Sequence, residues 1–174
     1  MNKLFKTLVI LLMISGISYA QTTEASKEGA LRDAKTTSEA TLKMDFETVL
    51  KYTYPPVLGL MGGKEKAIEL LTTTFDTMKE QGFVFEKADV VAVSDVVFEQ
   101  DQYRCYVEGY NQMTMSGMRI KSKSYLLGIY NAENKIWNFI EAKQLKNPAL
   151  KDMVLPDFIT ALEIPDDETT TEQL

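Results

Sequence analysis

The hydrophobic residues of this 174-residue chain change their spacing at Gly82. Before this point, residues 64–81 carry apolar side chains at intervals of three and four, the pattern of a helix with one buried face. These side chains are Ile68, Leu71, Phe75 and Met78. From Phe83 onward apolar and polar residues alternate, which indicates β-strands. Helices followed by successive strands favour an α+β fold, with helices packed on one face of a curved antiparallel sheet.

The second half of the chain is expected to form four long strands joined by short turns. Turn-forming residues occur at Gln100-Asp101, at Ser116-Gly117 and in the segment 131–134, and each segment is short enough to close a hairpin. The expected strands are residues 83–98, 102–115, 118–130 and 135–142. Consecutive hairpins predict an antiparallel meander.

Two further helices are expected before residue 64. Residues 30–43 carry a weak apolar stripe. Asp45 is a suitable N-cap for a helix over residues 46–54, because its carboxylate can accept a free backbone N–H. Pro55-Pro56 should end that helix, since proline has no N–H to donate, and residues 57–61 should form a short apolar turn.

The first 20 residues predict a secretory signal peptide. Two lysines precede the apolar run 8–14, and small residues stand before a cut between Ala20 and Gln21. The run is too short to span a bilayer about 30 Å thick. We therefore expect a secreted or periplasmic protein without a membrane span.

After the leader (residues 1–20), the chain divides into three parts by composition. We expect a flexible N-terminal segment over residues 21–29, a single α+β domain over residues 30–160 and an acidic, disordered tail over residues 161–174. The formal net charge of −6 opposes binding to nucleic acid.

The residue types that this sequence lacks limit the kinds of catalytic and metal site that it can form. There is no histidine, which excludes a Ser-His-Asp or Cys-His site, histidine metal ligation and imidazole acid–base catalysis. Cys105 is the only cysteine, so no intramolecular disulfide can form, and its apolar surroundings predict a buried side chain. No cofactor motif is present.

Four short segments carry a resemblance to a known superfamily. They are Tyr52-Thr53-Tyr54-Pro55, Met61-Gly62-Gly63-Lys64-Glu65-Lys66, Trp137-Asn138-Phe139-Ile140 and Leu155-Pro156. With its order of elements, the chain resembles the nuclear-transport-factor-2-like superfamily, the cystatin-like α+β cone, and within it small bacterial secreted proteins of unknown function. The resemblance implies a cone that often encloses an apolar pocket, and a possible homodimer through the sheet. The superfamily includes isomerases, dehydratases and non-catalytic binding modules, so it does not decide the chemistry.

The lack of a catalytic constellation favours a non-enzymatic domain that binds a small apolar molecule or a protein partner. The candidate pocket residues are Tyr54, Tyr106, Glu108, Tyr125, Trp137 and Glu141. An alternative is a histidine-free isomerase or hydrolase, in which Glu108 or Glu141 is the base and a nearby tyrosine, Tyr106, Tyr110 or Tyr125, is its partner. A carboxylate in an apolar pocket would suit proton transfer because burial raises its pKa.

A second alternative rests on a cluster of methionines. Met113, Met115 and Met118 flank the turn at Ser116-Gly117. Thioethers are soft ligands that select Cu(I), which makes these three residues weak candidates for a copper site. Packing of flexible apolar side chains at a hairpin end explains the same cluster without a metal.

Overall fold

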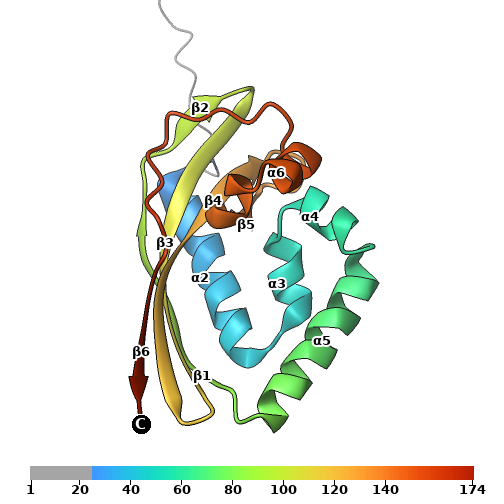
Figure 1. The fold of residues 1–174 in the computed structure, drawn as a ribbon. Helices are drawn as coiled ribbons and strands as arrows, with labels where there is room; N and C mark the ends of the chain where they lie inside the picture. The colour runs from blue at the N-terminus through green and yellow to red at the C-terminus, as the bar shows by residue number, and fades with distance from the viewer. Residues whose placement is uncertain (1–24) are drawn as a thin grey trace, which may run out of the picture.

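A long antiparallel hairpin forms the centre of the sheet in the computed structural model, which describes residues 25–174 (Figure 1). Strand β3 (Gln102–Met115) pairs with β4 (Met118–Asn131) over most of its length, from Arg104 to Met115. Ser116 and Gly117 both have positive φ, as a type I′ turn requires, which confirms the turn expected there. Residues 1–24, and with them the predicted signal peptide and its cleavage position, lie outside the described residues.

Each strand of this hairpin also pairs, along its other edge, with two shorter strands. β1 (Val84–Val93) and β2 (Val97–Glu99) pair with successive parts of β3. β5 (Ile136–Glu141) and β6 (Glu168–Gln173) pair with successive parts of β4. The result is a curved, open, antiparallel sheet of six strands, so the α+β class is confirmed.

The first strand differs from the single strand expected over residues 83–98. It breaks after Val93, where the Ser94 hydroxyl accepts the backbone N–H of Tyr106 at 2.9 Å. β1 also carries two register shifts against β3. Such bulges twist an edge strand and protect it from pairing with other chains.

The helices follow the predicted order but not every predicted boundary. α2 (Lys27–Lys43) begins inside the expected flexible segment, because the Ser26 hydroxyl caps it. α3 (Phe46–Tyr52) is capped by Asp45, as expected. Residues 57–61 are not a simple turn: α4 (Pro55–Leu60) starts at Pro55, since a helix tolerates proline in its first turn.

Helix α5 (Lys64–Glu80) confirms the strongest helix prediction, yet it lies away from the sheet (Figure 1). Only Ala67 of this helix is fully buried. Phe75 anchors it by ring contacts to Phe46, Phe83 and Phe85, with centroids 5.1–6.0 Å apart. Because α5 packs mainly against α3, it leaves part of the sheet uncovered.

The two faces of the sheet carry separate hydrophobic cores. On the inner face, which faces α2, the core includes Cys105, Val107, Trp137 and Phe139. The buried Asp33 joins α2 to β5 by accepting the backbone N–H of Trp137 at 2.9 Å. On the outer face, Leu127, Ile129 and Ile140 pack against the C-terminal part of the chain.

The C-terminal part differs from the irregular segment and disordered tail expected from composition. A 3₁₀ helix, η1 (Ala142–Lys146), and α6 (Pro148–Val154) follow β5, and residues 168–173 of the acidic tail form β6 on the edge of β4. No helix within residues 25–174 combines the length and apolar character needed to cross a membrane.

Ion pairs explain why the acidic tail docks. We call Arg119, Lys121 and Lys123, which share the outer face of β4, the basic row. Arg119 lies opposite Glu172 in the β4–β6 register, and Lys123 lies opposite Glu168. The Lys121 ammonium is 2.9 Å from the Glu172 carboxylate. Opposite charges at paired positions favour this register, and the backbone ladder adds to them.

Candidate functional site

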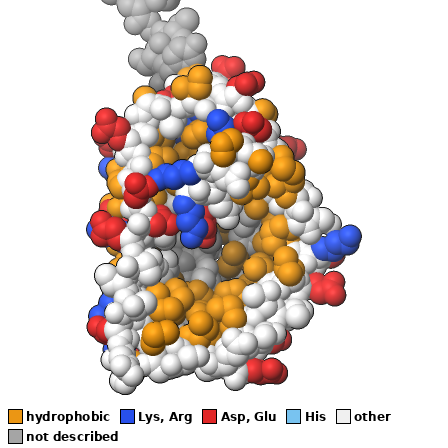
Figure 2. Space-filling model, viewed as in Figure 1, with side chains coloured by type: hydrophobic (Ala, Val, Ile, Leu, Met, Phe, Trp, Pro, Cys, Tyr) orange, Lys and Arg blue, Asp and Glu red, His pale blue; other side chains and the backbone are white. Residues whose placement is uncertain are grey.

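A cavity of about 470 Å³ lies between helices α2 and α3 and the inner face of the sheet. Figure 2 shows this side of the molecule hollowed at its centre, with hydrophobic side chains beside the hollow. Residues from η1 complete the lining next to the end of β5. The cavity lies where α5 leaves the sheet uncovered.

Small side chains on the sheet make the cavity deep. Gly109 lies opposite Ser124, and Asn111 lies opposite Ser122, so these four residues form one patch of the inner face, which we call the polar floor. A Cβ atom added at Gly109 would meet nothing closer than 3.6 Å. The cavity is therefore deep over these four residues, because their side chains fill little of the space.

The rest of the lining is mostly apolar. It is contributed by helices α2, α3 and α4 and by strands β1, β3, β4 and β5. The apolar residues are Ala34, Val49, Val57, Phe85, Ala88, Val90, Val107, Met113, Leu126, Phe139 and Ile140, with the ring of Tyr52. A cavity with this mixture can hold a small molecule by burying its apolar surface and can orient it by a few polar groups.

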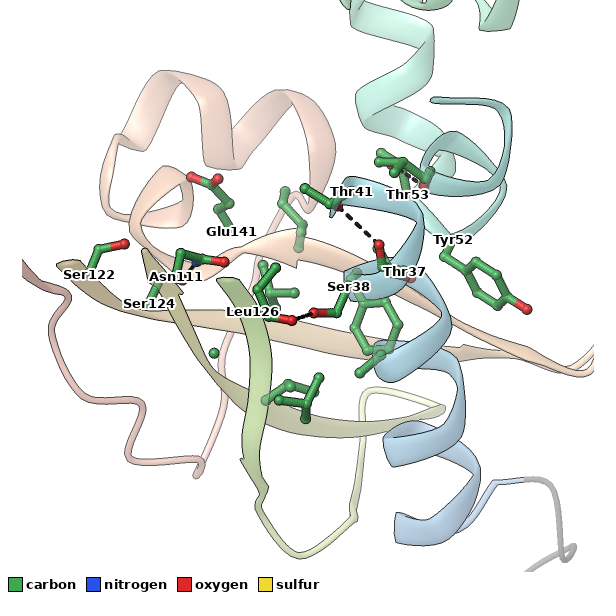
Figure 3. A pocket seen from close by; sticks show the side chains of 18 of the residues that line it. Thr37, Ser38, Thr41, Tyr52, Thr53, Asn111, Ser122, Ser124, Leu126 and Glu141 are labelled. Carbon is green, nitrogen blue, oxygen red and sulfur yellow. Dashed lines mark hydrogen bonds between the residues drawn. The ribbon is translucent and has the colours of Figure 1, made fainter. Parts of the chain in front are cut away.

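Helix α2 contributes a row of hydroxyls to the opposite wall (Figure 3). Thr37 donates to the Asp33 carbonyl at 2.9 Å and Thr41 donates to the Thr37 carbonyl at 3.0 Å. Ser38 donates to the Ala88 carbonyl of β1 and so fixes the helix to the sheet. These bonds hold the hydroxyl oxygens in place at the cavity wall.

Charged groups lie at the margin of the cavity. Glu141 is an exposed lining residue, and Lys143 lies 3.3 Å from its carboxylate. Asp89 also borders the cavity, but it pairs with the outer-face residue Tyr110, so its side chain lies on the outer face. Lys143 is also 3.8 Å from Asp167. The only cation of the lining is therefore already paired with two carboxylates.

Of the six candidate pocket residues, Glu141 lines the cavity and five do not. Trp137 is fully buried in the inner core, and Tyr54 packs with the outer core. Tyr106, Glu108 and Tyr125 do come together, but on the outer face. The rings of Tyr106 and Tyr125 are 5.9 Å apart, and Glu108 lies opposite Tyr125.

The outer-face cluster does not resemble a site for proton transfer. Burial raises the pKa of the Tyr125 phenol, and the neighbouring Glu108 carboxylate raises it further. Glu108 itself is 3.8 Å from the ammonium of Lys123. The backbone N–H of Tyr125 donates to Asp167, so the C-terminal segment lies beside this cluster.

The methionine cluster is brought onto one face of the hairpin end. Met115 pairs with Met118 in the register, and Met113, two residues earlier in β3, lines the cavity. Copper binding stays a prediction. Among the described residues, no group of three or more histidine, cysteine or carboxylate side chains is placed to hold a metal ion.

Cys105 is buried, as expected, and burial raises the pKa of its thiol to about 12. A thiol with this pKa stays protonated at neutral pH, so it is a weak nucleophile. In residues 25–174, every buried side-chain nitrogen and oxygen has a hydrogen-bond partner.

Sequence reasoning missed the residues that shape the cavity. The polar floor and the threonines of α2 were not among the candidates. A detectable signal was present: small residues alternate along both strands, at Gly109 and Asn111 and again at Ser122 and Ser124, and the Ser116-Gly117 turn fixes their pairing.

Fold and cavity together define an α+β domain with an amphipathic pocket on the inner face of an open sheet. Comparison of the chain with protein-family models, with curated proteins and with solved structures gave no match.

Proposed function

We propose that this chain is a non-enzymatic binding domain that holds a small, mainly apolar molecule in the inner-face cavity. The observation that carries the proposal is the cavity of about 470 Å³ with its apolar walls and fixed hydroxyls. This volume falls within the range of about 300–1,000 Å³ that is usual for small-molecule sites. We also propose membership of the nuclear-transport-factor-2-like superfamily, on the resemblance carried by the sequence segments; the α+β arrangement is consistent with it.

Burial of apolar surface would supply most of the binding energy. Each Å² of apolar ligand surface removed from water contributes about 25 cal/mol. The walls that would cover such a ligand are already held in place, because Ser38 bonds to β1 and Asp33 bonds to β5. A preformed site loses little conformational freedom on binding.

The geometry favours binding over the isomerase or hydrolase alternative. Glu141 is the one predicted base that lines the cavity, but it is exposed and paired with Lys143. A general base gains from an environment without water, which an exposed, ion-paired carboxylate lacks. Glu108 and its tyrosine neighbours lie on the other side of the sheet.

The location of the cavity can be tested by filling it. Gly109→Leu places a side chain over the polar floor, where a Cβ has room and the backbone is not in the left-handed region. We expect this variant to fold normally and to lose binding of the neutral dye Nile red, measured by fluorescence titration. Gly59→Leu is the matched control, since Gly59 lies in α4, outside the lining, with open space around it.

A Gly109→Leu variant that binds the dye as tightly as the wild type, with an unchanged circular dichroism spectrum, would place the binding surface elsewhere. Native mass spectrometry of the purified wild type would then show whether any small molecule accompanies the chain.

We also propose that the domain works outside the cytoplasm, as the leader predicts. Intact mass measurement of protein from the culture medium or the periplasm tests this. The expected mass is that of a chain beginning at Gln21. A chain that keeps Met1 and stays in the cytoplasm would contradict the proposal.

A further inference from the structure

The hydroxyl groups that line the cavity on the helix side already donate their protons in hydrogen bonds within the protein. Thr37 and Thr41 donate to backbone carbonyls of their own helix, at 2.9 and 3.0 Å, and Ser38 donates to the Ala88 carbonyl. Thr53, at the end of α3, donates to the Val49 carbonyl at 3.0 Å. A hydroxyl has one proton and two acceptor lone pairs, so each of these groups can now only accept.

The carboxylate of the lining acts in the same sense. Ionised Glu141 is an acceptor only. Lys143, the only lining cation, is held by Glu141 and Asp167. Glu141, Lys143 and Asp167 together carry a net negative charge, so an anionic ligand would meet this charge and no unpaired cation in the lining.

The polar floor can still donate hydrogen bonds, from the Ser122 and Ser124 hydroxyls and from the second N–H of the Asn111 amide. The Ser124 oxygen accepts from the Asn111 amide at 3.3 Å, and its own proton can still be donated. A hydroxyl group on a ligand could thus accept from the floor and donate to α2. A carboxylate could use only the floor.

We infer that the ligand of this pocket is a neutral or cationic amphiphile, with an apolar body and an alcohol or amine group that donates hydrogen bonds to the α2 wall. This inference rests on the proposed function, because it names the chemical class of the molecule that the cavity would hold. The acceptor-only wall faces the polar floor across the cavity, and apolar residues surround both (Figure 3).

Three probes of equal chain length test the class: octylamine, octan-1-ol and octanoate, each titrated into the full-length protein below its aggregation concentration and followed by NMR. The amine and the alcohol should bind at least about tenfold tighter than the carboxylate, since hydrogen bonds to unpaired acceptors and the sign of the charge both favour them. Shifts should concentrate at the amides of α2 and of the polar floor.

Thr41→Val removes one wall acceptor at nearly constant volume. It should weaken the amine and the alcohol by about three- to tenfold and leave octanoate unchanged. Thr77→Val is the matched control, because Thr77 makes the same bond to the Thr73 carbonyl, at 2.9 Å, on α5, outside the cavity.

The outcomes separate the two proposals. Octanoate that binds as tightly as the other two probes would overturn the inference about the ligand class and leave the pocket proposal standing. If none of the three probes binds, both proposals fail. Equal loss of affinity in Thr41→Val and Thr77→Val would mean that α2 acts through helix stability and would also overturn the inference.

Discussion

Each face of the β3–β4 hairpin carries a polar patch between the turn and the buried core, yet one patch is covered and the other is open. On the outer face, the basic row is covered by acidic residues of the chain itself, Glu172 and Glu168 from β6 and Glu86 from β1. On the inner face, the polar floor is small, neutral and faces a cavity. The charged side chains of the basic row bind carboxylates of the same chain. The small, neutral residues of the polar floor leave space that a separate molecule can occupy.

The largest effect should come from releasing the C-terminal segment that covers the outer face. Arg104 is only 1% exposed and donates to the Ile159 carbonyl at 2.9 Å and to the Gln100 side chain at 3.0 Å. Arg104→Met would remove these hydrogen bonds and the buried cation that lies 3.8 Å from the Glu99 carboxylate, and we expect it to lower the free energy of unfolding by about 3 kcal/mol. Urea denaturation measures the change.

Lys35→Met, at an exposed position of α2, is the control for loss of a positive charge. If Arg104→Met were no less stable than this control, the C-terminal segment would be held by apolar packing alone. The inner-face cavity should keep its dye affinity in either case.

Substitutions at two glycines allow the packed core and the cavity of the inner face to be compared. A Cβ atom at Gly128 would lie 3.1 Å from the Cys105 sulfur and 3.2 Å from the Phe139 ring, so Gly128→Ala should destabilise the fold by about 1–3 kcal/mol. Gly109→Ala meets no such contact and should be neutral or slightly stabilising, because glycine costs about 0.5–1 kcal/mol relative to alanine within a strand. Thermal unfolding of the two variants checks this difference; equal melting temperatures would contradict it.

The smallest effect should come from acid. Hydrogen bonds from Lys121 and Arg119 hold the pKa of Glu172 below its usual range, and hydrogen bonds from Arg119 and Gln112 do the same for Glu86. A carboxylate with a lowered pKa in the folded state stabilises that state above its ordinary pKa of about 4.3, and this stabilisation is lost as the pH falls through the lowered value.

We therefore expect hydrogen exchange at the amides of β6 to be slow at pH 7 and, after correction for intrinsic rates, less protected near pH 3. Glu172→Gln should reduce protection at pH 7 and flatten the pH dependence. Protection that is the same at both pH values would mean that the backbone ladder alone holds β6.

Local patterns predicted the elements of this fold well, because each depends on neighbouring residues. The helix over residues 64–81 and the turn at Ser116-Gly117 were predicted from spacing and turn chemistry. The strand β6 was not predicted, since composition alone favours disorder for an acidic segment. Its order depends on the basic row, which lies more than 40 residues away in the sequence.

The candidate site was predicted less well, for a related reason. Alternation shows which residues of a strand share a face, and it grouped Tyr106 with Glu108 correctly. It does not show which face the helices cover, and these residues lie on the face away from the cavity. The threonines of α2 were not among the candidates, and their hydroxyls donate to backbone carbonyls within the helix.

The position of the last residue has a mechanical consequence. The backbone N–H of Leu174 donates to the Gly117 carbonyl at 2.9 Å, so the chain ends at the tip of the hairpin, while α2 begins at the opposite end of the molecule (Figure 1). Pulling on Leu174 while the start of α2 is held would load β6 along its own length. All of its bonds to β4 would then share the force in shear, instead of opening one after another like a zip.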